Sequence, residues 1–185
     1  MGTVLAGMTM SLDGFIEDRN GSVARLYPDF DAMRQTDLLQ EEIRRTGAVV
    51  MGRRAYDMAQ DDFNGYEFQV PIFVLTHRAP EMVAKGENDL LRFTFITDGI
   101  DQAIAQARAA AGDKDVTVIG GAQTVQQCLQ AALVDELQID LVPLLLGSGL
   151  RLFEQPGSEP IELERIRVME YPWFTHLRFR VLKQH

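Results

Sequence analysis

Apolar and polar positions along the chain change their spacing several times, and the clearest change lies within residues 116–133. Val116–Ile119 is a short β-branched run, which is typical of a buried strand. The next apolar positions share one face of a helix: Val125, Cys128, Leu129, Ala132 and Leu133. Gly120 and Gly121 connect the two patterns, so the sequence predicts a strand that runs through bare backbone into a helix.

Strand and helix patterns alternate through the part of the chain before this segment. A helix is predicted from Pro28–Asp29 to Gly47, with Ala32, Leu39 and Ile43 on one face. Asp98 is expected to cap a second helix, from about Gly99 to Ala111. Apolar runs predict buried strands at Thr3–Met10, Ala48–Met51, Pro71–Leu75 and Phe93–Thr97.

After residue 133 the pattern predicts strands without helices. Glu136–Val142, Ile161–Met169 and Thr175–Leu182 alternate in the way expected of strands. In the last of them, Leu177, Phe179 and Val181 face one way, and His176, Arg178 and Arg180 face the other. The sequence therefore predicts one α/β domain over residues 1–185. Its mixed sheet is mostly parallel, with antiparallel C-terminal strands and helices on both faces.

Composition and charge narrow the possible functions. A chain of 185 residues with 46% hydrophobic residues is expected to form one globular domain. A net charge of −9 argues against a nucleic-acid surface, which needs a basic footprint. The single cysteine, Cys128, is expected to be a small buried hydrophobe and fits a reducing compartment. No signal-peptide pattern or membrane-length apolar run is present, so a cytoplasmic protein is expected.

Candidate chemistry lies where three of the predicted strands end. Arg53–Arg54 follows one strand, His77–Arg78 follows another, and Gly120–Gly121 begins the helix after the third. If these strands are parallel, their carboxyl ends share one edge, where open α/β sheets bind ligands. Free N–H groups at a helix N-terminus favour an anion, most often a phosphate. The alternative is that the arginines are solvated loop residues and the glycines serve only packing.

Other kinds of site find little support. The histidines at 77, 176 and 185 lack metal-ligand spacing, so no metal is expected. Glu41–Glu42 and Asp61–Asp62 are adjacent carboxylates that point apart, and the pattern predicts solvated surface for them. The serines have no nucleophile elbow, and the chain has no GxxxxGK[ST] loop.

Four segments carry a resemblance to a known family: VVMGRRAYD, PIFVLTHR, VTVIGGAQTVQQCL and VDELQIDLVPLLLGSGLRLF. Together they resemble the dihydrofolate-reductase fold. More closely, they resemble the riboflavin-biosynthesis reductase family (RibD C-terminal domain) in its stand-alone bacterial form. The resemblance runs from about Val4 to the C-terminus, and the opening GMTMSLDGFI fits it as well.

This resemblance implies NADPH as the cofactor and a cis peptide bond between the paired glycines. It also implies residues for each part of the site. Those implied near the nicotinamide are Ser11, Leu12, Gly14, Phe15 and Ile16. Those implied for the adenosine-side phosphates, the adenine and the 2′-phosphate are Gly52, Arg53, Arg54, Thr76, His77 and Arg78. Those implied for the pyrophosphate are Gly120, Gly121, Ala122, Gln123 and Thr124. Those implied to border the substrate are Gly147, Ser148, Gly149 and Phe153.

The resemblance suggests one candidate for catalysis. Folate reductases have a carboxylate early in the first helix, and Asp37 lies one residue out of register with that place. The alternative for Asp37 is a partly solvated helix carboxylate. The expected function is NADPH-dependent hydride transfer to a small heterocyclic or carbonyl substrate, pterin- or pyrimidine-like. The alternative is a nucleotide-binding protein without catalytic turnover.

One apolar run predicts an assembly. Val142 and Leu144–Leu146 are nearly continuous, and a single sheet face would leave some of them exposed. Riboflavin-type relatives are dimers, so the resemblance implies a C2 homodimer through this region.

Overall fold

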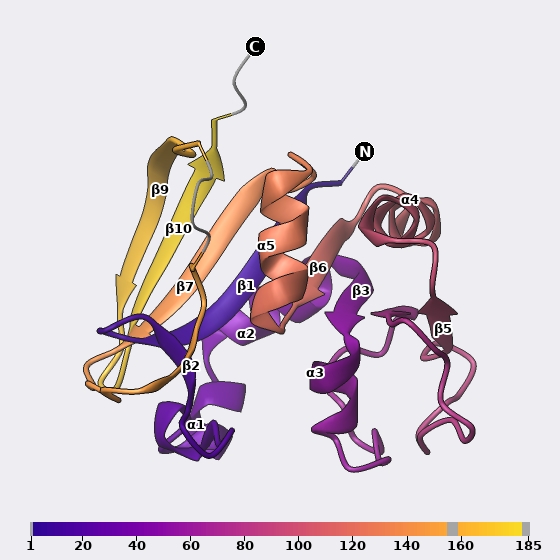
Figure 1. Cartoon of the computed structure of the whole chain (residues 1–185), viewed down its shortest axis with the longest axis horizontal. Coiled ribbons are helices and arrows are strands. Elements are labelled where there is room, and N and C mark those ends of the chain that lie inside the picture. Colours follow the sequence, from indigo (N-terminus) through magenta and orange to yellow (C-terminus); the bar gives the residue numbers. More distant parts are fainter. Residues whose placement is uncertain (1, 155–158, 183–185) are drawn as a thin grey trace.

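An eight-stranded sheet forms the centre of the computed structural model, which describes residues 2–154 and 159–182. Its spatial order is β5 (Phe93–Ile96), β4 (Ile72–Leu75), β3 (Thr46–Gly52), β6 (Asp115–Ile119), β1 (Val4–Ser11), β7 (Glu136–Val142), β10 (Thr175–Val181) and β9 (Leu163–Glu170). The strands from β5 to β7 are parallel, and β10 is antiparallel to both of its neighbours. The predicted mixed sheet with antiparallel C-terminal strands is confirmed (Figure 1).

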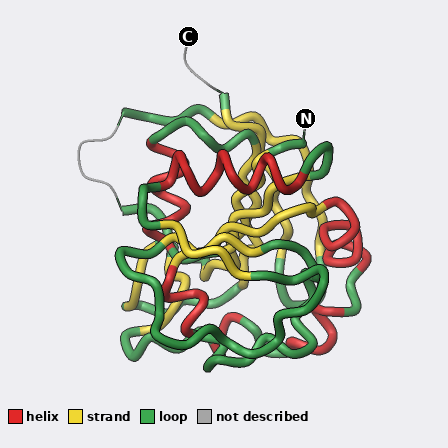
Figure 2. Tube along the Cα trace, turned by 90° about the vertical axis from the view of Figure 1, so that its right-hand side faces the viewer, coloured by secondary structure: helices red, strands yellow, loops and turns green. Residues whose placement is uncertain are grey.

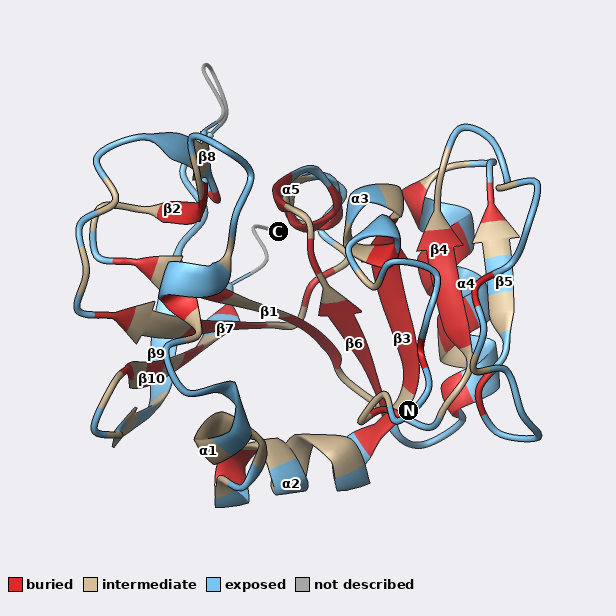
Figure 3. Ribbon diagram, turned by 90° about the horizontal axis from the view of Figure 1, so that it is seen from below, coloured by how far each residue is buried: buried red, intermediate tan, exposed pale blue. Residues whose placement is uncertain are grey.

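Helices cover both faces of this sheet. The helical elements are η1 (Ala24–Leu26), α1 (Phe30–Arg34), α2 (Asp37–Arg45), α3 (Arg53–Asp57), α4 (Ile100–Ala111) and α5 (Ala122–Gln130). Figure 3 shows α2 on one side of the sheet and α5 on the other, and α4 packs in the same core cluster as α5. Figure 2 shows the same layering from the side, with strands running between helices. A separate antiparallel ribbon of β2 (Phe15–Asp18) and β8 (Gly149–Arg151) lies beside β1.

The continuous apolar runs of the sequence became the most deeply buried strands. Val49 and Val50 of β3 and Val118 of β6 have no exposed surface, because parallel central strands are covered on both faces. Side chains of α4 and α5 pack on one face, and Leu39 and Ile43 of α2 pack on the other. Cys128 is fully buried within the α5 layer, as expected.

The single helix expected from Pro28–Asp29 to Gly47 is a wrong prediction, because the structure contains two helices there. The α1 helix ends at Arg34, and Thr36 caps α2, its hydroxyl oxygen accepting the Leu39 backbone N–H at 3.3 Å. Gly47 does not stop the helix but lies in β3. A Cβ there would lie 2.7 Å from the Lys114 Cβ, so close packing explains this glycine.

The polar face of β10 is covered by other elements over most of its length. His176 has no exposed surface and Arg178 has 4%, whereas Arg180 is exposed. His176 and Arg178 pair with carboxylates of the adjacent strand β7, so burial does not leave them without a partner. The sheet therefore has a polar layer beneath α2 that alternation alone does not reveal.

The apolar run at 142–146, which predicts a dimer contact, packs mostly within the protomer. Val142 is buried, and Leu144 and Leu146 pack against its cluster, so Leu145 alone of these four is strongly exposed, at 66%. Exposed apolar side chains lie instead on the edge strand β9, at Leu163, Ile166 and Val168. Within residues 2–154 and 159–182, every helix is too short or too polar to cross a lipid bilayer.

Candidate functional site

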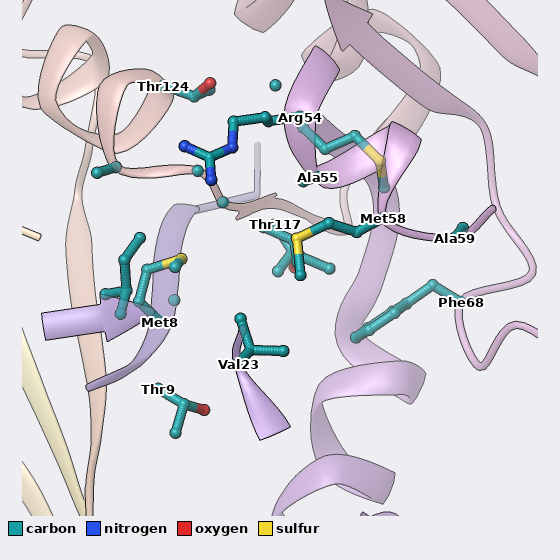
Figure 4. Close-up of a pocket in the computed structure, with 18 of the residues that line it drawn as sticks. Met8, Thr9, Val23, Arg54, Ala55, Met58, Ala59, Phe68, Thr117 and Thr124 are labelled. Carbon is teal, nitrogen blue, oxygen red and sulfur yellow. The ribbon is translucent and has the colours of Figure 1, made fainter. Parts of the chain in front are cut away.

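A cleft of about 940 Å³ extends from the carboxyl ends of the parallel strands to α2. Figure 4 shows Arg54 and Thr124 on one side of it, with Thr9 and Val23 opposite. Met8 and Thr117 lie between them. The cleft has two ends with different chemistry, one at the strand ends and one beside α2 and β7.

Three strand ends meet at the first end of the cleft, as the sequence predicted. The parallel register aligns β3 with β4 and with β6. The Gly52 backbone N–H donates to the Gly120 carbonyl oxygen at 2.8 Å, which joins two of the strand ends directly. The residues that line this end include all of those predicted for the phosphates and adenine: Gly52, Arg53, Arg54, Thr76, His77, Arg78, Gly120, Gly121, Ala122, Gln123 and Thr124.

The glycine pair presents bare backbone to this end of the cleft. The Gly120–Gly121 peptide bond is cis, as the resemblance implied, and Gly120 has φ +55°. Gly121 is the N-cap of α5 and offers no side chain to cap it. A Cβ at Gly52 would lie 2.5 Å from the Thr124 hydroxyl oxygen, so this approach requires glycine. The start of α5 is therefore open to an anion.

The basic side chains at this end differ in how strongly the protein already holds them. Arg53 donates to Asp57 at 2.8 Å and to the Arg78 carbonyl oxygen. Arg54 donates to both carboxylate oxygens of Glu17, at 2.6 and 2.7 Å, and so links α3 to β2. The Arg78 side chain is 87% exposed. Arg78 is therefore the arginine of this group that is most accessible to a phosphate.

Most of the residues predicted to lie near the nicotinamide do not line the cleft. Of its five residues, Ile16 lines the cleft, while Ser11, Leu12, Gly14 and Phe15 are not among the lining residues. Ser11 instead orders the loop, since its hydroxyl donates to Asp13 and accepts the Phe15 backbone N–H.

The residues predicted to border the substrate lie in the adjoining loop. The Asp13 carboxylate accepts the backbone N–H groups of Leu146 and Gly147, which fastens this loop to the one after β1. The Ser11 hydroxyl, together with these two N–H groups, lowers the pKa of Asp13 to about 2. Gly147, Ser148 and Phe153 do not line the cleft, and Gly149 borders a smaller hollow beside Arg54.

The second end of the cleft has an acidic floor that sequence reasoning missed. Glu42 of α2 and Gln138 and Asp140 of β7 line it. The Gln138 amide donates to the Glu42 carboxylate, and Asp140 is held by the buried His176 ring at 2.8 Å. The apolar residues around this floor include Tyr27, Phe30, Met33, Leu39, Tyr66 and Phe68.

Burial and charge give Glu42 an unusual protonation equilibrium. Burial is the largest cause that raises its pKa, and the negative charge of Asp140 adds to it. The hydrogen bond from Gln138 and the nearby His176 and Arg178 act in the opposite direction. The result is a pKa of about 7, so the protonated and ionised forms are both well populated near neutral pH.

Glu42 could have been recognised from its helical spacing. The pattern grouped it with Glu41 as solvated surface, but it follows the buried Leu38 by one helical turn. Glu41 does face away from the cleft, where it pairs with Arg167 at 3.0 Å. Asp37 is exposed in the first turn of α2 and is not a lining residue of the cleft, so its placement gives no support to a catalytic role. Its role stays a prediction.

In the described part of the chain, no group of three or more His, Cys, Asp or Glu side chains is arranged to bind a metal ion. The site is instead a cleft with a basic, glycine-rich end and an acidic end. On a mostly parallel sheet with antiparallel C-terminal strands, this defines an α/β protein of the dihydrofolate-reductase type.

The family assignment is direct. The sequence matches the RibD C-terminal domain family over residues 2–173, and the chain belongs to this family. It is similar to the uncharacterized protein YyaP of Bacillus subtilis (strain 168), with 28% identity over 81% of this chain and 79% of that protein. It is also similar to the riboflavin biosynthesis protein RibD of Corynebacterium ammoniagenes, with 29% identity over 84% of this chain but only 45% of that longer protein.

Solved structures agree with this assignment. A putative riboflavin biosynthesis protein from Shewanella sp. PV-4 superposes with a TM-score of 0.80 at 25% identity, covering 98% of this chain and 99% of that one. The Thermotoga maritima diaminohydroxyphosphoribosylaminopyrimidine deaminase/5-amino-6-(5-phosphoribosylamino)uracil reductase superposes with a TM-score of 0.71 at 14% identity. That match covers 98% of this chain and 57% of the Thermotoga chain, and it shows a shared fold.

Proposed function

We propose that this protein is an NADPH-dependent reductase that transfers a hydride to a small heterocyclic or carbonyl substrate of pterin- or pyrimidine-like type. The observation that carries the proposal is the convergence of three parallel strand ends and the uncapped start of α5 in one cleft. The same cleft continues to its acidic end beside α2, here called the chamber. A long nucleotide and a small substrate can therefore meet end to end.

The residues of the first end fit the parts of the cofactor. The open backbone from Gly120 to Thr124 suits a pyrophosphate, because its N–H groups and the helix dipole favour negative charge. Arg53 is assigned to the phosphates that NADPH and NADH share, and the exposed Arg78 to the 2′-phosphate. Thr76 and His77 lie beside Arg78 and would flank the adenine.

The chain's own groups position the reactants and manage the proton. When bound, NADPH supplies the hydride. Met8 and Ile16 line the cleft, and their apolar side chains help exclude water. Glu42 reaches the chamber and is partly protonated at neutral pH, so we assign it the delivery of the proton that accompanies reduction.

Calorimetric titration of NADPH and NADH tests the cofactor assignment. A hydrogen bond to a charged group is worth about 1.5–3 kcal/mol, which corresponds to roughly ten- to a hundredfold in affinity. Arg78→Ala is expected to weaken NADPH by this order and NADH much less, whereas Arg53→Ala should weaken both. Arg54→Ala should have a smaller effect, because Arg54 must first leave Glu17.

Arg44→Ala is the matched control, since Arg44 is an exposed arginine outside the cleft. The effects should be larger at low salt, where the negative net charge of the protein is less screened. If the variants bind both nucleotides as the wild type does, the cofactor does not occupy this end of the cleft.

Turnover is tested by the loss of NADPH absorbance with pterins and pyrimidines. Glu42→Gln is expected to lower kcat and change the pH profile. Asp37→Asn tests the catalytic role predicted for Asp37 from the sequence, and an unchanged kcat and pH profile would exclude that role. NADPH binding without turnover of any of these substrates would favour the alternative, a nucleotide-binding protein without catalysis.

We also propose a cytoplasmic homodimer, with the exposed apolar side chains of β9 as the contact in place of the run at 142–146. An unpaired edge strand with apolar side chains is a ready template for pairing with a second copy.

A further inference from the structure

We propose that the α2 end of the cleft selects a flat, hydrogen-bond-donating heterocycle that carries no phosphate, with Glu42, Gln138 and Asp140 as its recognition floor. This inference deepens the proposed function by naming the substrate class. Binding at this floor can be measured without any cofactor, so the two proposals can fail separately.

The cleft is divided by charge. The strand-end half contains Arg53, Arg54 and Arg78, together with His77. The two carboxylates of this half, Asp57 and Glu17, are paired with Arg53 and Arg54, which leaves Arg78 as its exposed cation. The α2 half contains three carboxyl groups, from Glu42, Glu67 and Asp140. Asp140 and Glu67 lie close enough to the Tyr27 hydroxyl that, after burial, their charges contribute to raising its pKa. These carboxyl groups therefore surround one chamber.

Only one basic side chain among the described lining residues belongs to this chamber, and it is already engaged. Arg34 lies 3.5 Å from the Glu67 carboxylate and donates to the Gly65 carbonyl oxygen at 2.9 Å. A phosphate at this end would meet the carboxyl groups without a free cation, and juxtaposed like charges cost several kcal/mol. The chamber therefore disfavours an anionic ligand.

Gln138 supplies the positive part of the argument. Its side chain lines the cleft with 5% of the residue exposed, and its amide nitrogen donates to Glu42. The other atom of the amide, Oε1, is buried and has no hydrogen-bond partner within the described chain. A buried acceptor without a partner is costly, so a ligand N–H or O–H group that meets this oxygen after a small turn of the amide toward the cleft would recover part of that penalty.

The walls favour a planar ring over an extended sugar chain. Phe68, Tyr66, Tyr27 and Phe30 all line the cleft, and Tyr27 and Phe30 pack edge to face at 6.0 Å. Aromatic side chains bury flat apolar faces well, while the polar floor fixes the edge of the ring. An amino-substituted pyrimidine or pteridine has this combination of flat faces and N–H donors.

The Thermotoga enzyme provides the contrast, because the substrate in its name, 5-amino-6-(5-phosphoribosylamino)uracil, carries a phosphate. The matched ligand pair is therefore this compound and the same compound without its phosphate. Calorimetry with the nucleotide-free protein is expected to show binding of the dephosphorylated compound about tenfold tighter or more. Tighter or equal binding of the phosphorylated compound, or failure of both to bind, would overturn the proposal.

Two variants test the cause of the preference. Glu67→Gln leaves Arg34 without its carboxylate partner, so the preference for the dephosphorylated compound should fall several-fold. Glu41→Gln is the matched control, because Glu41 lies on the same protein layer but outside the cleft, and the preference should stay as in the wild type. A preference that Glu67→Gln leaves unchanged would contradict the role of charge.

The recognition floor is tested by Gln138→Leu, which removes the unpartnered acceptor and should weaken the dephosphorylated compound at least about tenfold. Circular dichroism confirms that the variant is folded, and unchanged affinity in the folded variant would overturn the floor assignment. NADPH titrated into the same variant should bind as it does to the wild type. If the wild type does not bind NADPH, the proposed cofactor is refuted, but the comparison of the phosphorylated and dephosphorylated compounds still tests the present proposal.

Discussion

Glu41 and Glu42 are adjacent in the sequence, yet the structure shifts their pKa values in opposite directions. Glu42 points to the buried floor of the cleft, where burial raises its pKa from an ordinary 4.5 to about 7. Glu41 points outward, where the hydrogen bond from Arg167 lowers its pKa. Replacing each by glutamine removes one titrating group and keeps the side-chain shape. Comparing the two variants therefore separates the effect of burial on the pKa from the effect of the shared position in the helix.

The sign of the Glu42 effect follows from proton release. Between pH 4.5 and 7 the folded protein holds a proton on Glu42 that the unfolded chain has lost, so the free energy of unfolding falls as pH rises. One pH unit corresponds to about 1.36 kcal/mol. The two pKa values therefore give a loss of about 2 to 3 kcal/mol between pH 5 and 8. Glu42→Gln should lack this loss. The free energy of unfolding of the variant should therefore increase relative to that of the wild type as the pH rises from 5 to 8.

Glu41 should behave in the opposite way. A lowered pKa stabilises the folded protein above the ordinary value of 4.5, and this contribution disappears as pH falls through the lower, folded-state pKa. Glu41→Gln should therefore lose stability relative to the wild type at neutral pH and approach it in acid.

Denaturant unfolding of the three proteins, followed by Trp173 fluorescence at several pH values from 4 to 8, measures both effects. Carbon-13 NMR of labelled glutamate carboxyl groups gives the Glu42 pKa directly. A difference between Glu42→Gln and the wild type that stays constant from pH 5 to 8 would refute the reasoning. It would mean that the Glu42 carboxyl is hydrated and titrates as it does in the unfolded chain.

Three further predictions concern the rest of the cleft and the assembly. Glu17→Gln releases Arg54 from its ion pair and is expected to tighten NADPH binding up to about fivefold, measured by calorimetry; weaker binding would show that the pair preorganises the site. Gly52→Ala places a Cβ 2.5 Å from a hydroxyl oxygen of α5 and should cost about 1–3 kcal/mol in thermal unfolding, whereas Gly7→Ala, whose Cβ would have only ordinary contacts, should cost less. Val168→Arg on the exposed edge strand should reduce the mass found by light scattering from twice 20.8 kDa to 20.8 kDa, and a wild-type monomer would contradict the dimer.

Local patterns were sufficient for the sheet and for one end of the cleft. The runs at Ala48–Met51 and Val116–Ile119 are continuous because parallel central strands are buried on both faces, and the structure places both runs there. Parallel strands also point their carboxyl ends the same way. For that reason the sequence alone groups the residues after β3, β4 and β6 at one edge of the sheet.

The acidic end of the cleft was decided by tertiary structure alone. Glu42 meets Gln138 across 96 positions of sequence, and Asp140 meets His176 across 36, in a layer formed only when α2 meets β7 and β10 pairs with β7. A helix carboxylate has the same local pattern whether it is solvated, as Asp37 is, or covered, as Glu42 is. The sequence by itself determined which strands are buried and which strand ends bear cations. The desolvation that shifts a pKa depends on neighbours brought together by folding, so only the tertiary structure decided which carboxyl faces the chamber.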